Sequence, residues 1–272
     1  MKFTKMHGNG NDFIVLEDFN NEISDDGALA RKLCHRSFGI GADGILIVRK
    51  SSIAHIQMVI INSDGSYAAM CGNGIRCFAK YVWDKKLVEN TVIDIETGDG
   101  VKKAYLNVED NEVKTITINM GKPSFAPAVI PAVSEEELIN RKIVANGKEY
   151  VINAVLMGVP HTVIIGDLDE ICVSEGKYIE KHTMFPKGTN VNFCQIISRD
   201  RLKVETWERG AGPTLACGTG SCASVVITNR LGYTDKKVTV QIPGGSLFIE
   251  LTEEGVLMTG PAEISFWGEY NL

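Results

Sequence analysis

The sequence predicts an α+β fold built from two similar domains. Its 272 residues are enough for two domains that each bury a core. The motif MCGNGIRC, which begins at Met70, returns as ACGTGSCA at Ala216, so Cys217 follows Cys71 at an offset of 146 residues. Segments rich in β-branched residues outnumber helical patterns along the whole chain. Together these observations predict two pseudo-symmetric domains that arose by internal duplication.

The duplication extends beyond the two cysteine motifs. Four pairs of segments keep the same order at offsets of 146 to 150 residues, a period too long for a solenoid of small repeats. The pairs are GNGNDFIVL with GVPHTVIIG, GADGILI with GTNVNFC, INSDG with WERGA, and TGDG with PGGS.

The proline-containing segment from Gly121 to Pro127 interrupts the strand pattern and predicts the domain boundary. We therefore expect an N-terminal domain at 1–120 and a C-terminal domain at 121–262. The tail at 263–272 lies beyond the matched segments and is expected to return to the first domain as a closing strand.

Local patterns place one apolar helix behind each repeated cysteine motif. Because both helices begin with small residues, we expect them to lie inside curved sheets. The acidic run SEEEL predicts the exposed first turn of another helix. The expected helices are 27–36, 73–87, 135–141, 174–182 and 219–231, and the expected strands are 53–62, 91–96, 113–120, 155–166, 202–208, 237–242 and 246–251.

Composition favours a cytoplasmic protein whose main partner is a small molecule. The net charge is -6 and no dense Lys/Arg run occurs, which argues against nucleic acid or an anionic membrane surface as partner. No apolar run reaches membrane-spanning length, and the N-terminus lacks the apolar core of a signal peptide. The seven cysteines form no C-x-x-C pair, so a disulfide framework is not expected.

No metal or organic cofactor is expected. Four cysteines occur in the two repeated motifs, but their spacing does not match structural zinc sites. The G-x-G-x-x-G pattern from Gly39 to Gly44 follows a helix and opens a strand, the reverse of a dinucleotide-binding loop. Nothing indicates a pyridoxal phosphate site. The cysteines outside the paired positions 71 and 217 are expected in the core; they are Cys34, Cys77, Cys172, Cys194 and Cys222.

Cys71 and Cys217 are expected to be the reactive groups. A helix N-terminus offers free backbone N–H groups and a positive dipole end, which bind anions and favour thiolate. If the two repeats face each other, a carboxylate held between the helices would stabilise a carbanion at its α-carbon. One thiolate could then remove the α-proton while a thiol on the opposite face delivers another. This pattern predicts cofactor-independent racemisation or epimerisation of an amino acid.

Polar residues occupy equivalent positions in the two copies and suit an amino-acid ligand. Arg209 adds a fork that can bind a carboxylate. The pairs are Asn11 with His161, Asp43 with Asn190, and Asn62 with Glu208.

Across nearly its whole length the sequence resembles the diaminopimelate epimerases. The motifs KMHGNGNDF, FGIGADG, NSDGS, MCGNGIRCFAKY, GVPH, FPKGTNVNF and ERGAGPTLACGTGSCA carry the resemblance. It implies two domains, each a curved, mostly antiparallel sheet around a central helix, with the active site in the cleft between them. It also implies a homodimer that interconverts LL- and meso-diaminopimelate in lysine and peptidoglycan precursor biosynthesis.

The resemblance also assigns roles to single residues. Cys71 and Cys217 would transfer the protons, and His161 would lie in the site near a cysteine. The other implied contacts are backbone N–H groups of Gly72, Asn73, Gly218 and Thr219 with the reacting carboxylate, Asn11 and Glu208 with the reacting ammonium, and Asn62, Asn190 and Arg209 with the distal end of the substrate.

Two departures from the family pattern leave the substrate open. Val159 replaces the Asn of a GNPH motif, and Gly44 stands where many members have Gln. Arg209 still favours a distal carboxylate, because a buried guanidinium without a partner is costly. The alternatives are a same-mechanism racemase or epimerase of lanthionine, lysine or histidine, and a non-catalytic amino-acid-binding protein.

Overall fold

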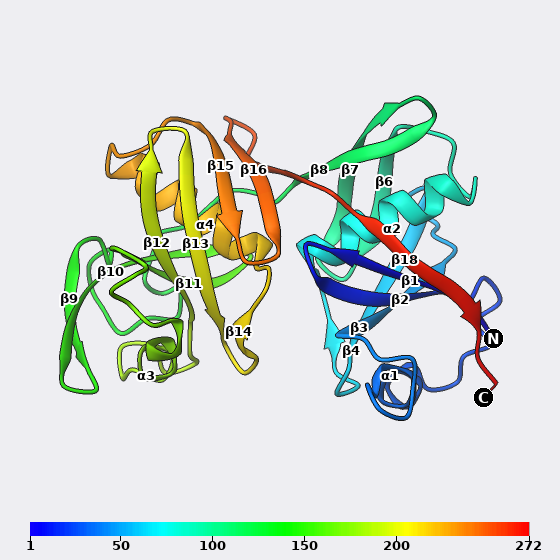
Figure 1. Ribbon diagram of the computed structural model, residues 1–272, viewed down its shortest axis with the longest axis horizontal. Helices are drawn as coiled ribbons and strands as arrows, with labels where there is room; N and C mark the ends of the chain where they lie inside the picture. Colours follow the sequence, from blue (N-terminus) through cyan, green and yellow to red (C-terminus); the bar gives the residue numbers. More distant parts are fainter. Residues whose placement is uncertain (272) are drawn as a thin grey trace. The chain divides into compact units, whose positions relative to one another are not determined.

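The computed structural model describes residues 1–271, and the chain divides into two compact units. Unit 1 contains Met1–Asn119 and the segment from Thr259 onward, and unit 2 contains Met120–Met258. Each unit is a set of strands around one long helix, α2 (Gly72–Asp84) in unit 1 and α4 (Gly218–Arg230) in unit 2 (Figure 1). No helix within residues 1–271 is long and apolar enough to cross a membrane.

The remaining elements are short helices and the strands of the two units. The helices are α1 (Asp26–Cys34), η1 (Val173–Glu175) and α3 (Gly176–Glu180). Unit 1 contains β1 (Lys2–Gly8), β2 (Asn11–Glu17), β3 (Gly44–Arg49), β4 (Ile56–Asn62), β5 (Tyr67–Ala68), β6 (Val92–Thr97), β7 (Gly100–Glu109), β8 (Glu112–Asn119) and β18 (Glu263–Glu269). Unit 2 contains β9 (Arg141–Ala145), β10 (Lys148–Met157), β11 (Val159–Ile165), β12 (Asn190–Ser198), β13 (Arg201–Glu208), β14 (Gly212–Thr214), β15 (Lys237–Ile242) and β16 (Gly245–Leu251), and β17 (Val256–Gly260) leads back to unit 1.

The two units share one strand topology. In unit 1, β1–β2, β3–β4 and β6–β7 pair antiparallel, whereas β2–β3 and β4–β6 pair parallel. In unit 2, β10–β11, β12–β13 and β15–β16 pair antiparallel, whereas β11–β12 and β13–β15 pair parallel. The same alternation occurs in the same order, as a duplicated chain requires. The predicted α+β class, with curved and mostly antiparallel sheets around a central helix, is confirmed.

The two central helices are buried in different ways. In α4, Ser221, Ser224 and Thr228 are completely buried, and each hydroxyl donates to the carbonyl oxygen four residues earlier in the same helix. This back-bonding satisfies the hydroxyls and lets apolar strands surround the helix. In α2, the buried Arg76 donates to Asn9 Oδ1 at 2.7 Å and to Pro261 O at 3.1 Å. Arg76 therefore ties α2 both to the β1–β2 turn and to the connection that leads into β18.

The helix predicted at 135–141 is wrong. This segment forms bends, and β9 begins at Arg141. The Ser134 hydroxyl bonds the backbone of Glu136 at both N and O, a local turn that competes with a helix. Asn140 has a positive φ of 52° and donates its backbone N–H to Asn153 Oδ1, which directs the chain into β9. The acidic residues are exposed, as predicted, but on a turn.

Replacement of Phe78 by Ala tests the central position of α2. Phe78 is completely buried, so the cavity left by Phe78→Ala should lower the free energy of unfolding by about 3–5 kcal/mol. The measurement is urea denaturation followed by far-UV circular dichroism. Phe38, which is 83% exposed, provides the matched control: Phe38→Ala should change stability by less than about 0.5 kcal/mol. Equal effects of the two substitutions would contradict the assignment of α2 as the core helix.

Candidate active site

Cys71 caps the N-terminus of the buried helix α2. Its sulfur accepts the backbone N–H of Gly74 at 3.4 Å, and its thiol donates to Asn11 Oδ1 at 3.7 Å. The buried Asn73 donates its side-chain N–H to the same oxygen at 3.2 Å. Cys71, Asn11 and Asn73 therefore form one cluster at a helix end, where free N–H groups and the helix dipole favour negative charge.

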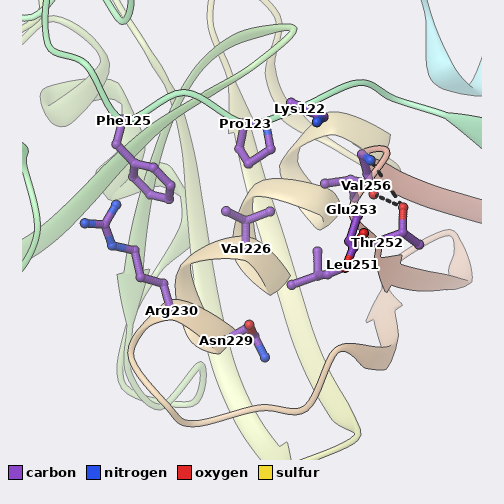
Figure 2. Close-up of a pocket in the computed structure, with 11 residues that line it drawn as sticks. Lys122, Pro123, Phe125, Val226, Asn229, Arg230, Leu251, Thr252, Glu253 and Val256 are labelled. Atoms are coloured by element: carbon purple, nitrogen blue, oxygen red, sulfur yellow. Dashed lines mark hydrogen bonds between the residues drawn. The ribbon is translucent and has the colours of Figure 1, made fainter.

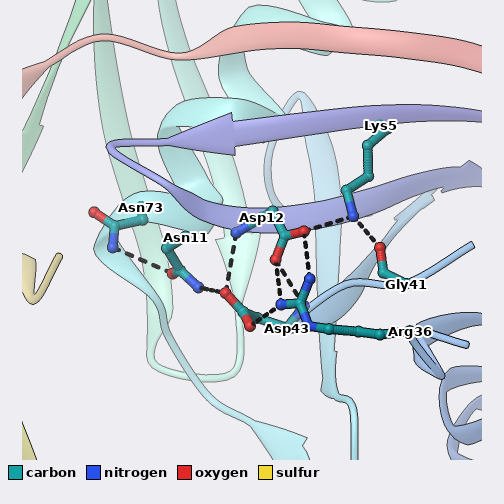
Figure 3. Close-up of polar contacts among 7 residues, drawn as sticks. All are labelled: Lys5, Asn11, Asp12, Arg36, Gly41, Asp43 and Asn73. Carbon is teal, nitrogen blue, oxygen red and sulfur yellow. Dashed lines mark hydrogen bonds and ion pairs between the residues drawn. The ribbon is translucent and has the colours of Figure 1, made fainter. Parts of the chain in front are cut away.

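A network of charged residues contacts this cluster through Asn11 (Figure 3). Asp43 accepts the Asn11 side-chain N–H at 2.7 Å and pairs with Arg36 at 2.7 Å. Arg36 also pairs with Asp12 at 2.9 Å, and the buried Lys5 pairs with Asp12 at 2.6 Å and donates to Gly41 O. Burial by itself would raise the pKa of Asp12, but the hydrogen bonds from Arg36 and Lys5 outweigh it and lower this pKa to about 2.

The remaining predicted residue of unit 1, Asn62, lies at the end of the neighbouring strand. Asn62 ends β4 directly opposite Gly44, the first residue of β3, and its side chain donates to Ser66 Oγ at 3.0 Å. A side chain at position 44 would place its Cβ 2.7 Å from the carbonyl oxygen of Ile61. The structure therefore gives a local reason for glycine at this departure from the family pattern.

Cys217 occupies the equivalent place at the N-terminus of α4 in unit 2. It is buried, and its sulfur lies 3.6 Å from Thr219 Oγ1. A Cβ on Gly220 would collide with Asn192 Oδ1 and lie 3.2 Å from both Cys217 Sγ and Thr206 Oγ1. Glycine is therefore required at position 220, and Asn192 and Thr206 lie beside the first turn that carries the thiol.

His161 belongs to a neutral hydrogen-bond network around Asn192. Asn192 donates to His161 Nδ1 at 3.1 Å and to Thr162 O at 3.2 Å, and its oxygen accepts the Thr206 hydroxyl at 3.0 Å. Because Nδ1 accepts, the neutral imidazole carries its proton on Nε2, a buried atom without a hydrogen-bond partner in residues 1–271. Burial, assisted by the positive charge of Arg209, lowers the pKa of His161 to about 3, against the opposing effect of the Asn192 hydrogen bond.

Asn190, Glu208 and Arg209 form a further group in unit 2. Asn190 accepts the backbone N–H of Arg209 at 2.8 Å and donates to Pro160 O at 3.2 Å. The expectation of a buried Arg209 guanidinium is wrong: Arg209 is exposed and donates to Lys187 O at 2.8 Å. Glu208 accepts the Thr214 hydroxyl at 2.7 Å. A carboxylate, an amide and an exposed guanidinium thus lie along adjacent strand ends.

Two parts of this site were absent from the sequence prediction. Asn192 lies two residues after Asn190, so the N-V-N alternation was a signal that both side chains share one face of β12. The network of Lys5, Asp12 and Arg36 joins three separate segments. No spacing rule could have assembled it from the sequence.

The other cysteines are distinguished by their surroundings. Burial raises the pKa of Cys34, Cys77 and Cys194 to about 12, so these thiols stay protonated, and Cys222 is also completely buried. The expectation that Cys172 belongs to the core is wrong. It is exposed, because it lies in the loop before η1, and its hydrogen bonds with Ser174 lower its pKa.

A separate pocket of about 390 Å³ lies in unit 2 at the opposite end of α4 from Cys217 (Figure 2). Its apolar lining includes Phe125 and Val226, and several of its polar side chains already have partners. Arg230 pairs with Glu137 and stacks over the Phe125 ring at 4.0 Å, while Asn229 donates to Thr234 O. Because its lining contains no cysteine, this pocket does not suit the predicted proton transfer by thiols.

Comparison with known proteins identifies relatives over the full length. The family model for diaminopimelate epimerase matches residues 3–126 and 153–265. A diaminopimelate epimerase from Clostridium perfringens is 57% identical, with 99% of each chain covered, and one from Alkaliphilus metalliredigens is 48% identical, covering 99% of this chain and 97% of the relative.

Solved structures with much lower sequence identity share the fold. A hydroxyproline epimerase from Agrobacterium vitis superposes with a TM-score of 0.72 at 15% identity, covering 98% of this chain and 91% of the other. A phenazine biosynthesis protein from Bacillus anthracis superposes with a TM-score of 0.74 at 14% identity, covering 100% and 99%.

Burial of the neutral His161 should make unit 2 less stable in mild acid. The folded-state pKa of about 3 lies below the ordinary value of 6.5, so the unfolded chain binds a proton that the folded unit does not as the pH falls below 6.5. Between pH 7.5 and pH 5 this single group should cost about 2 kcal/mol of stability. His161→Gln should remove that part of the pH dependence.

The measurement is urea unfolding at both pH values, followed through Trp207 fluorescence in a background with Trp83→Phe and Trp267→Phe. His182→Gln, at a half-buried histidine of the same unit, is the matched control and should retain the full pH dependence. An unchanged pH dependence in His161→Gln would show that His161 is not held neutral.

Proposed function

The chain belongs to the diaminopimelate epimerase family, and from this premise we propose that it interconverts LL- and meso-diaminopimelate by proton transfer at the α-carbon. The observation that carries the proposal is the placement of one cysteine at the N-terminus of the central helix in each of the two repeats. During turnover both thiols must reach opposite faces of one carbon. One sulfur, as thiolate, takes the α-proton, and the other, as thiol, donates its proton to the opposite face of the carbanion.

The helix ends explain how a weakly acidic α-proton could be removed without a cofactor. The backbone N–H groups of Gly72 and Asn73, and those of Gly218 and Thr219, begin the two helices and can stabilise the substrate carboxylate as negative charge develops. Asn11 presents an oxygen that can accept from the reacting ammonium. Glu208 supplies a carboxylate for the same group.

The neutral His161 suits this chemistry. Because its pKa is low, His161 carries no positive charge that would compete with the helix N-termini for the substrate carboxylate. Its Nε2–H group can donate a hydrogen bond to sulfur or substrate. Asn192 fixes this tautomer. His161 is thus proposed as a neutral donor of the site, with the two sulfurs as the acid and the base.

Substrate preference is proposed to depend on the exposed guanidinium of Arg209, with Asn190 and Asn62 as further polar contacts. Arg209 can bind a second carboxylate in a bidentate manner, which favours diaminopimelate over a substrate with one carboxylate. Val159 is also exposed at the start of β11 and offers no side-chain hydrogen bond in the place of the family's asparagine.

Substitution of either proposed catalytic thiol should strongly slow epimerisation. Cys71→Ser and Cys217→Ser should each lower kcat by about 10²–10⁴, because a hydroxyl is a much poorer acid/base group at this position. The assay follows entry of solvent deuterium at the α-carbon, by mass spectrometry under reducing conditions. Cys172→Ser removes an exposed thiol that lies outside the proposed site and should keep wild-type activity.

The same exchange assay tests the substrate. LL-Diaminopimelate, lanthionine, lysine and histidine are compared in parallel. Exchange with diaminopimelate alone is the expected result, and exchange with another amino acid alone would keep the two-thiol mechanism and change the substrate. A protein that binds amino acids without exchanging any α-proton would contradict the proposed function.

We further propose that the protein acts in the cytoplasm as a homodimer. Exposed apolar residues on β18 support self-association: Ile264, Phe266 and Trp267 are exposed, the last at 77%. Analytical ultracentrifugation should show a dimer for the wild type and a monomer for Trp267→Glu. A wild-type monomer at micromolar concentration would contradict the proposed assembly.

A further inference from the structure

Asp43 makes contacts that point to a role beyond holding the fold. We propose that Asp43 is a positioning residue for the reaction: it fixes the Asn11 amide so that its oxygen, and not its N–H group, faces the Cys71 thiol. This inference rests on the proposed function, since it concerns the acceptor beside one of the two proton-transferring sulfurs.

The orientation of Asn11 follows from what its neighbours can donate or accept. The carboxylate of Asp43 can only accept, so the 2.7 Å contact with Asn11 must come from the amide N–H. The opposite end of the amide is then an oxygen, which accepts from the Cys71 thiol at 3.7 Å and from Asn73 Nδ2 at 3.2 Å. A reversed amide would place N–H groups against the Asn73 N–H and would lose the hydrogen bond to Asp43.

Asp43 is itself held on several sides. Its carboxylate accepts from Arg36 Nη2 at 2.7 Å and from the backbone N–H of Asp12 at 3.1 Å. Its backbone N–H donates to Asp12, and its carbonyl oxygen accepts from Ser63 N at 2.9 Å. Arg36 therefore fixes the Asp43 carboxylate, and Asp43 fixes the Asn11 amide, each through a direct hydrogen bond (Figure 3).

An oxygen beside the sulfur serves the proposed reaction in two ways. It attracts the substrate ammonium, which an N–H group in the same place would repel. It also disfavours a resting thiolate at Cys71, because the partial negative charge of the Asn11 oxygen repels a negatively charged sulfur, and a less stabilised thiolate is a stronger base.

Asp43→Asn should reverse this arrangement while conserving size. An amide has a single oxygen, and the charged Arg36, which can only donate, should take it in preference to the neutral backbone N–H of Asp12. The substituted amide then presents N–H groups to Asn11, whose own amide turns over and directs N–H groups at Cys71. We expect kcat/KM for α-proton exchange to fall by about 10- to 100-fold, as expected for a displaced group next to the reacting atoms.

A double-mutant cycle tests whether Asp43 acts through Asn11. Asp43→Asn is measured alone and together with Asn11→Ala, by α-proton exchange. If Asn11 carries the effect, Asp43→Asn should change kcat/KM by less than about threefold once Asn11 is Ala, since coupled residues give non-additive effects. An equal loss in both backgrounds would overturn the proposal. Asp18→Asn, which breaks the pair with Arg49 in the same unit, is the matched control and should leave kcat/KM unchanged.

Thiol reactivity gives a second readout that does not require turnover. The rate of Cys71 alkylation by iodoacetamide, followed on its peptide by mass spectrometry in a Cys172→Ser background, should rise several-fold in Asp43→Asn, because N–H groups at the sulfur favour thiolate. The rise should vanish with Asn11→Ala. No rise, or the same rise in both backgrounds, would overturn the proposal. If the wild type exchanged no substrate, the proposed function would fail, and the alkylation rates would still decide the orientation of Asn11.

Discussion

A helix N-terminus buried inside a sheet is the constraint on which both units depend. Its first N–H groups have no partners within the helix, so other groups must satisfy them where water is excluded. In unit 1 the Cys71 sulfur accepts one of them. In unit 2 the first turn of α4 approaches the Asn192 network so closely that only glycine fits at position 220. Small residues, thiols and bound anions are compatible with such an end, and this explains the composition of both repeated motifs.

The duplicated topology surrounds two chemically different environments. Cys71 lies in front of a charged network, with Asp43 and Arg36 behind Asn11. Cys217 lies beside a neutral one, in which Asn192 and a neutral His161 take the equivalent place. Duplication therefore preserved the backbone geometry, whereas divergence of a few polar residues gave the two sulfurs unequal surroundings.

The sequence was sufficient to predict the elements that depend on repetition and periodicity. The α+β class follows from the strand patterns and the paired motifs, and the beginnings of α2 and α4 follow from the small residues after each cysteine. The error at 135–141 had a local cause, because the Ser134 hydroxyl and the left-handed Asn140 outweighed helix propensity. The Lys5, Asp12 and Arg36 network was not predictable, since it depends on three segments that meet only in the folded sheet.

The two bonds of Arg76 bear on the order in which the chain can fold. Unit 2 is continuous in sequence, so it can fold as soon as its own residues are available. Unit 1 is not continuous: the guanidinium of Arg76 needs the carbonyl oxygen of Pro261, and β1 needs β18 as its partner. During synthesis unit 1 must therefore wait, with its central helix incompletely bonded, until β18 has emerged from the ribosome. Unit 1 begins before unit 2 and is completed after it.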